Sequence, residues 1–259
     1  LLTLVFSSDV LAKTHTTTAS QKSHLTKASN KQVSSKQEYS RNSAKSSSLP
    51  DLRKYPSGTP RKKAFLRTVM PYITSQNAAI TVERNWLISK QYQGQWSPAE
   101  RARLKDIAKR YKVKWSGNTR KIPWNTLLER VDIIPTSMVA TMAAAESGWG
   151  TSKLARNNNN LFGMKCMKGR CTNAPGKVKG YSQFSSVKES VSAYVTNLNT
   201  HPAYSSFRKS RAQLRKADQE VTATAMIHKL KGYSTKGKSY NNYLFAMYQD
   251  NQRLIAAHM

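Results

Sequence analysis

A glutamate at the end of an apolar helix is the residue in this sequence with the clearest potential for chemistry. In residues 135–152, PTSMVATMAAAESGWGTS, the larger apolar side chains recur at helical spacing. Glu146 follows Met142 by four positions and Ala143 by three, so it continues the apolar face. A buried carboxylate is unfavourable unless it is paired or protonated. The pattern favours a catalytic acid, with Gly148 and Gly150 ending the helix; the alternative is an ordinary glutamate that turns to solvent.

Four asparagines at positions 157–160 open the next stretch, which runs to Lys165. Asparagine suits loop backbone and left-handed conformations, and its amide offers a sugar both a donor and an acceptor. An ordinary loop is the alternative. Between Lys165 and Phe184 glycines separate short alternating runs such as residues 178–184. This spacing predicts a small β-hairpin lobe.

The only two cysteines, Cys166 and Cys171, stand five positions apart around Gly169. In an exported protein they could form a disulfide across a tight loop. With no histidine or third cysteine nearby they make a poor zinc site, and we predict no metal. Whether they are paired is left open.

Helices are expected to position these residues. An amphipathic segment begins at Ala64 and should continue, across a break near Pro71, towards Ile88. Capping boxes at Ser97–Glu100 and Ser186–Glu189 each predict a helix start. Further helices are expected at residues 124–131, 203–216, 221–230 and 239–257.

The chain is strongly basic, with a formal net charge of +30 that lies mostly after residue 60. Such a charge favours a polyanionic partner, which is nucleic acid, anionic lipid or an anionic wall polymer. No apolar run approaches the roughly 20 residues that span a bilayer, so stable membrane insertion is not expected.

Composition divides the chain into four parts. Residues 1–12 are typical of the end of a secretory signal, with Val10-Leu-Ala12 as a cleavage site, although a buried strand or a disordered end would also fit. Residues 13–58 are rich in Ser, Thr and Lys, which predicts a disordered basic linker. Residues 59–124 are expected to form a helical extension, and residues 125–259 the main domain. The signal-like start indicates export to the periplasm or cell envelope.

Several motifs together resemble a known family. They are Glu146-Ser-Gly-Trp-Gly-Thr-Ser152, Asn160-Leu-Phe-Gly-Met-Lys165, the stretch from Tyr181 to Phe184, and the loop with Tyr233 and Tyr240. Over about residues 125–259 the chain is similar to the glucosaminidase domain of glycoside hydrolase family seventy-three. The resemblance implies an α+β, mostly helical, lysozyme-like fold with two lobes. It also implies cleavage of the GlcNAc-β-1,4-MurNAc bond of peptidoglycan.

The resemblance makes Glu146 the general acid. This agrees with the physical interpretation, because a glutamate held among apolar residues keeps the proton that a glycosidic leaving group needs. Substrate contacts are expected from Asn160 and Tyr181. Trp149 and Phe162 are expected either to pack beneath the acid or to stack on a sugar ring.

The second catalytic group is not evident. From Lys165 to Phe184 there is no acidic residue, and the nearest one, Glu189, already has a capping position. The family's tyrosine motif is altered here to Tyr233-Ser-Thr-Lys-Gly-Lys-Ser-Tyr240, so either tyrosine could match it. The missing acid favours a mechanism with one carboxylate, in which the GlcNAc acetamide attacks the anomeric carbon and a tyrosine supports it.

Three functions remain open from the sequence. The first is a glucosaminidase that cleaves the wall, without a cofactor. The second is a lytic transglycosylase, which would leave an anhydro-sugar. The third is a non-catalytic protein that binds the wall or nucleic acid. The signal-like start argues against nucleic acid, and Glu146 on an apolar face argues against pure binding. The expected partner is a peptidoglycan strand; no protein partner is evident.

Overall fold

The computed structural model describes residues 48–166, 171, 174–230, 233 and 237–259. The expected signal remnant and residues 13–47 of the expected linker lie outside the described residues. Contacts place Ser46–Met259 in one unit, to which all the described residues belong. No helix among these residues is both long enough and apolar enough to cross a bilayer.

The end of the expected linker is folded, which corrects its boundary at residue 58. Leu49 and Leu52 are buried, and Leu52 opens the short helix η1 (Leu52–Lys54). The backbone N–H of Leu49 donates to Asn159 Oδ1 at 3.1 Å. Two buried leucines and one long-range hydrogen bond anchor this stretch to the rest of the unit.

The long helix α2 (Thr59–Lys90) runs through Pro71 without ending. The break that we expected near this proline is therefore wrong. A proline inside a helix removes one backbone hydrogen bond and strains the preceding turn. Here a face that includes Phe65, Val69 and Ile80 is buried along α2, which packs on two other helices. That burial, worth roughly 1.5–3 kcal/mol for each large side chain, offsets the local penalty.

Two further helices precede the acid-bearing one. They are α3 (Pro98–Arg110) and α4 (Trp124–Arg130), with the short helix η2 (Thr119–Lys121) between them. The capping box predicted for Ser97 and Glu100 is present in full, since each side chain bonds the other residue's backbone N–H.

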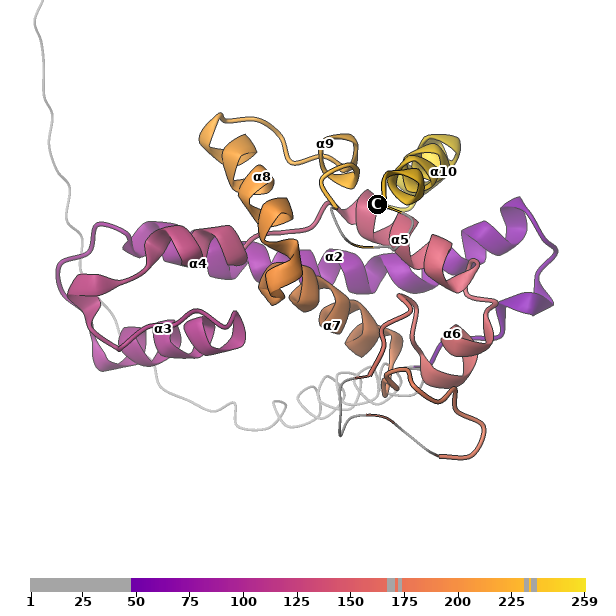
Figure 1. The fold of residues 1–259 in the computed structure, drawn as a ribbon, viewed down its shortest axis with the longest axis horizontal. Helices are drawn as coiled ribbons and strands as arrows, with labels where there is room; N and C mark the ends of the chain where they lie inside the picture. The colour runs from indigo at the N-terminus through magenta and orange to yellow at the C-terminus, as the bar shows by residue number, and fades with distance from the viewer. Residues whose placement is uncertain (1–47, 167–170, 172–173, 231–232, 234–236) are drawn as a thin grey trace, which may run out of the picture. The chain divides into compact units, whose positions relative to one another are not determined.

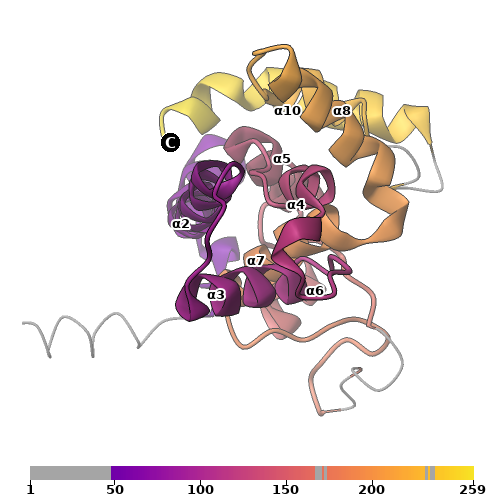
Figure 2. The same cartoon turned by 90° about the vertical axis from the view of Figure 1, so that its left-hand side faces the viewer.

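Helix α5 (Thr136–Ser147) carries Glu146 and is buried over most of its surface. It packs between α2 and α10 (Lys238–Ala256), as Figures 1 and 2 show. A helix that is apolar on every side needs neighbours on every side. The acid at its end is thereby fixed by the core of the protein.

The remaining helices follow in chain order (Figure 1). They are α6 (Lys153–Asn158), α7 (Val187–Thr200), η3 (Pro202–Tyr204), α8 (Ser205–Lys216) and α9 (Ala223–Ile227). Helix α7 packs on α2 and α4, and α9 packs on α5 and α10. The predicted segments match these helices except that α9 is shorter than residues 221–230.

A buried ionic cluster holds the turn before α5. Asp132 is 1% exposed, and its carboxylate receives two hydrogen bonds from Arg215, of 3.0 and 3.1 Å. Arg84 of α2 and Arg211 of α8 approach it at 3.5 and 3.8 Å. Arg211 is fully buried and donates to the backbone oxygens of Glu129, Asp132 and Ile133. Burial lowers the pKa of Arg211 to about 10.

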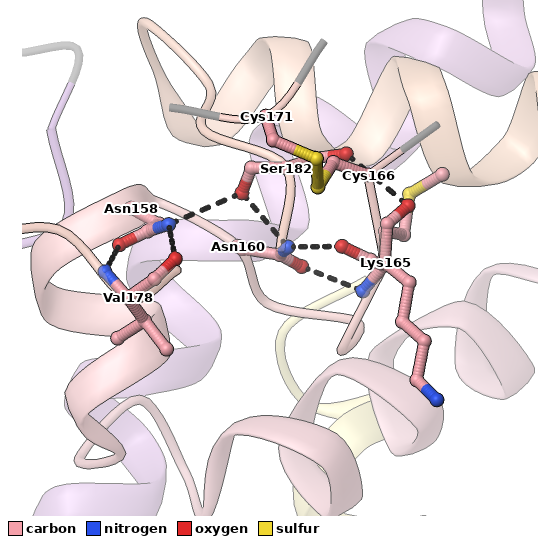
Figure 3. The surroundings of a disulfide bond; sticks show 8 residues. Asn158, Asn160, Lys165, Cys166, Cys171, Val178 and Ser182 are labelled. Carbon is pink, nitrogen blue, oxygen red and sulfur yellow. Dashed lines mark hydrogen bonds between the residues drawn. A yellow bond between two sulfur atoms is a disulfide. The ribbon is translucent and has the colours of Figure 1, made fainter. Parts of the chain in front are cut away.

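The expected β-hairpin lobe is not confirmed. Among the described residues the only β-structure is an isolated antiparallel bridge between Lys165 and Tyr181. Two backbone hydrogen bonds flank this bridge, from Cys166 to Gly180 and from Ser182 to Met164, and side chains hold the loops beyond it. Asn158 bonds the N–H and C=O of Val178, and Asn160 donates to the carbonyl of Ser182 (Figure 3). The observed class is therefore mostly helical, with little strand.

Candidate active site

A cleft of about 910 Å³ opens at the end of α5. One wall is a single face of α7, whose positions 189, 193, 196, 197 and 200 follow helical spacing. The cleft is also lined by Glu146, by the loop from Phe162 to Lys165, and by two tyrosines, Tyr233 and Tyr240. The cleft extends along α7 for about 16 Å, from Glu189 to Thr200, at 1.5 Å per helical residue. It is long enough for more than one sugar ring.

Glu146 lies half-buried in this cleft, as predicted from its place on the apolar face. Burial raises the pKa of its carboxyl above the ordinary value, and a hydrogen bond from Tyr240 opposes part of that rise. Gly163 comes so close that a Cβ atom there would lie 3.3 Å from Glu146 Oε2. The backbone at Gly163 has φ of 62°, which also favours glycine. The acid therefore faces backbone on one side and an aromatic hydroxyl on the other.

Tyr240 is brought to the acid by the first turn of α10. Its hydroxyl donates to Glu146 Oε1. Burial and the neighbouring Glu146 raise the pKa of Tyr240 well above its ordinary value, so the hydroxyl stays protonated and keeps donating.

Tyr233 lies beside Tyr240, with ring centroids 5.8 Å apart and planes 14° from parallel. It meets the ring of Tyr194 edge-on at 6.5 Å and that of Tyr204 at 6.2 Å. The sequence did not identify Tyr194 and Tyr204 as site residues. Tyr194 is one of the apolar residues of α7 and looked like core, while nothing around Tyr204 distinguishes it.

Glu189 lines the same cleft as Glu146, and its side chain is exposed. It stands in the first turn of α7, where Ser186 Oγ accepts its backbone N–H. Its own carboxylate accepts from the N–H and hydroxyl of Ser185, both at 2.6 Å. The reciprocal bond thus reaches one residue earlier than a capping box requires. Glu189 combines a capping position with access to the cleft.

Of the four residues predicted to bind substrate, only Phe162 lines the cleft. Its ring stacks on Tyr194 with centroids 4.0 Å apart, so it packs beneath the site. Trp149 instead meets Phe65 of α2 edge-on at 5.6 Å, with Lys62 over its ring. The structure gives Trp149 a packing role because the turn after α5 directs it to α2.

Asn160 and Tyr181 also lie outside the lining of the cleft. Asn160 is 1% exposed, donates to the carbonyls of Met164 and Ser182, and accepts from the N–H of Met164. Its amide is therefore engaged by the loop and not open to a sugar. Tyr181 forms the bridge to Lys165. Both residues shape the loop that carries Phe162 and Gly163.

The two cysteines form a disulfide whose Cα atoms are 5.1 Å apart (Figure 3). It adjoins the bridge at Lys165 and so restrains the loop at the edge of the cleft. Within the described part of the chain, no group of three or more His, Cys, Asp or Glu side chains is arranged to hold a metal ion.

Gly150 packs the turn after Glu146 against the start of the folded unit. A Cβ atom at this position would lie 2.7 Å from Leu52 Cδ1 and 3.1 Å from the ring of Phe65. Its φ of 77° also favours glycine. The backbone beyond the acid is thus placed by close packing on η1 and α2.

Three comparisons relate the chain to known proteins. Residues 123–253 match the family named Glucosaminidase, described as mannosyl-glycoprotein endo-β-N-acetylglucosaminidase. The chain is 99% identical over 259 residues to protein bax of Escherichia coli (strain K12), covering all of this chain and 94% of that protein. Among solved structures it matches the catalytic domain of the autolysin Auto from Listeria monocytogenes at 21% identity with a TM-score of 0.34. That match covers 66% of this chain and 96% of the other. The chain belongs to the glucosaminidase family.

Proposed function

We propose that this protein is a peptidoglycan hydrolase, an endo-β-N-acetylglucosaminidase that cleaves GlcNAc-β-1,4-MurNAc bonds with Glu146 as general acid. The observation that carries the proposal is a half-buried carboxyl with a raised pKa, placed in a long cleft by a buried helix. A sugar oxygen leaves poorly as an alkoxide, so the bond breaks readily only when an acid delivers a proton.

The contacts of Glu146 support separate roles for its two oxygens. Tyr240 donates to Oε1, so the proton of the acid form resides on Oε2. Oε2 faces Gly163, where the absent side chain leaves room beside the acid. Once the proton has gone to the leaving sugar, the Tyr240 hydroxyl stabilises the carboxylate that remains.

Two routes complete the reaction. In the first, the acetamide oxygen of GlcNAc attacks the anomeric carbon while the glycosidic bond breaks and Glu146 protonates the departing oxygen. The hydroxyl of Tyr233 or Tyr240 orients the acetamide, and water then opens the oxazolinium and leaves GlcNAc at the new reducing end. In the second, Glu189 acts as a base that activates water from across the cleft. Two observations favour the first route. The carboxylate of Glu189 already accepts hydrogen bonds from Ser185. The stacked rings of Tyr233 and Tyr240 lie next to Glu146, where they could orient an acetamide.

Peptidoglycan fits this protein better than the mannosyl-glycoprotein in the family description. Both substrates present N-acetylglucosamine in a β-linkage, so the acid chemistry is common to them. Peptidoglycan also carries many carboxylates, and a chain of net charge +30 attracts such a polymer. Action on the wall requires export, in agreement with the signal remnant expected at residues 1–12.

The test is digestion of purified sacculi with analysis of the new chain ends. A glucosaminidase leaves GlcNAc at the reducing end, whereas a lytic transglycosylase leaves anhydro-MurNAc and a pure binding protein leaves no new end. Glu146→Gln removes the proton donor and keeps the shape, so digestion should fall by about 10²–10⁴-fold while the melting temperature stays close to that of the wild type. Digestion by this variant at the wild-type rate would rule out Glu146 as the acid.

A further inference from the structure

The cleft reaches beyond the part of the chain that matches the family. Lys112 lines it, although the family match begins at residue 123. Lys112 follows α3 and belongs to the helical extension, which the proposed chemistry at Glu146 does not use. Its side chain is exposed in the cleft.

The backbone of Lys112 adopts a conformation that side chains disfavour. Its φ is 54°, in the left-handed region where glycine is the usual residue. The N–H of Lys112 bonds the carbonyl of Lys109, and the N–H of Val113 bonds that of Ala108. These two bonds form a Schellman motif at the end of α3. A lysine therefore occupies a position where glycine would relieve strain.

A neighbouring helix fixes this turn. Arg130 of α4 donates to the carbonyls of Tyr111 and Lys112, at 3.0 and 2.7 Å. Helix α4 in turn packs on α7 and α8. The Lys112 side chain thus starts from a backbone held at both its N–H and its carbonyl, which limits the directions that it can take.

The surroundings of Lys112 suit an anion. No carboxylate among the described residues lies within ion-pair distance of its ammonium group. At the end of α7 the carbonyls of Leu198 and His201 already accept from Arg208, so they are engaged by a cation. Glu189, the other acid besides Glu146 that lines the cleft, stands at the opposite end of α7.

We propose that Lys112 is a specificity-determining residue, which binds a carboxylate of the glycan strand in the cleft that also holds Glu146. The inference rests on the proposed function and adds a contact from outside the family-matched region. The carboxylate comes either from the lactyl group of a MurNAc unit or from its peptide. Both sources present the same charge to the ammonium group.

The experiment compares kcat/KM for glycan strands that carry free carboxylates with that for the same strands after amidation. One pair of substrates uses strands stripped of peptides, which leaves lactyl carboxylates; the other uses peptide-bearing strands. In Lys112→Gly, the preference for free carboxylates should fall about two- to fivefold, the range of an exposed ion pair. Lys112→Glu should reduce the preference further, and Lys112→Arg should retain it.

The protein supplies a matched control for the backbone. Asp218 also has a positive φ, of 52°, in the same motif after α8, and it does not line the cleft. Asp218→Gly and Lys112→Gly both remove a side chain from a left-handed backbone position, and neither should lower the melting temperature appreciably. Lys105→Ala, on the exposed side of α3, controls for loss of one positive charge. Neither control should change the preference.

The outcomes separate this inference from the proposed function. If wild type releases no new ends from any strand, the proposed function fails. If wild type is active and Lys112→Gly keeps its preference on both pairs of substrates, the role of Lys112 is refuted. A loss of preference on stripped strands identifies the lactyl carboxylate, and a loss confined to peptide-bearing strands identifies the peptide.

Discussion

Two opposing effects act on the pKa of the Glu146 carboxyl. Burial favours its protonated form, while the hydroxyl of Tyr240 favours the carboxylate. The balance sets the pH at which the acid loses its proton. Because the general acid that we propose works only while protonated, turnover should fall as pH rises through this raised pKa.

Replacing Tyr240 by Phe tests that balance. The variant loses the hydrogen bond that stabilises the carboxylate, so the pKa of Glu146 rises further. The alkaline limb of the kcat/KM profile should then move to higher pH. The measurement is a pH profile on soluble glycan strands. Tyr243→Phe, an exposed neighbour outside the cleft, should leave the limb in place; a shift to lower pH in Tyr240→Phe would contradict this account.

Among the elements, α7 forms one wall of the cleft, and its first turn is capped. Glu189 lines the cleft and also takes part in the capping. Glutamine at this position can still accept from Ser185, so Glu189→Gln changes the charge with little change in geometry. We expect the free energy of unfolding to drop by less than about 1 kcal/mol and turnover to stay within a few-fold of wild type. Unfolding in urea and sacculus digestion measure the two effects. Full stability with no turnover would make Glu189 the base.

The ionic cluster around Asp132 joins α2 and α8 to the turn that leads into α5. Asp132→Asn leaves the buried Arg211, together with Arg84 and Arg215, without its counter-charge. It should lower the free energy of unfolding by about 3–5 kcal/mol. Asp106→Asn breaks an exposed pair with Arg110 and should cost no more than about 0.5 kcal/mol. Equal losses in denaturant unfolding would mean that backbone carbonyls alone hold the arginines.

Local patterns predicted most helices because capping motifs and apolar spacing depend only on residues that are close together in the sequence. Pro71 shows where such patterns fail, since only packing on distant helices decides that α2 continues. The hairpin between residues 165 and 184 was expected from its glycines, but side-chain amides such as that of Asn158 order its loops.

The site was predictable to a similar extent. Glu146 was a candidate from its position on the apolar face, and Tyr233 and Tyr240 were candidates from the altered tyrosine motif. All three line the cleft. Tyr194, Tyr204 and Tyr233 are in contact because α7, η3 and the last loop pack together. The spacing of residues along the sequence does not predict such packing. Trp149 and Asn160 belong to the motifs that carry the resemblance, yet their side chains serve packing and loop structure.

For the whole molecule, the folded unit begins well before the family-matched residues. A chain starting at Ser48 should fold and digest soluble strands, and its binding to sacculi should remain salt-sensitive because most of the basic charge lies after residue 60. A chain starting at Thr59 also loses Leu49 and Leu52. The lost packing of Leu52 alone should cost about 2–5 kcal/mol.

Urea unfolding of the two truncated chains, with wild type as reference, measures this difference. Equal stability of both chains would show that residues 48–58 contribute nothing. A large loss already in the chain that starts at Ser48 would show that earlier residues are needed for folding.

The contact around Gly150 limits how this protein can be recombined with its relatives. Leu52 and Phe65 fill the space that a side chain at position 150 would need, so the turn beyond the acid and the start of the unit are fitted to each other. Residues 123–253 grafted onto a foreign N-terminal region would keep Glu146 but lose the partner surface that places its turn. A working hybrid therefore has to include residues 48–66, or supply two apolar side chains of the same shape at the same place.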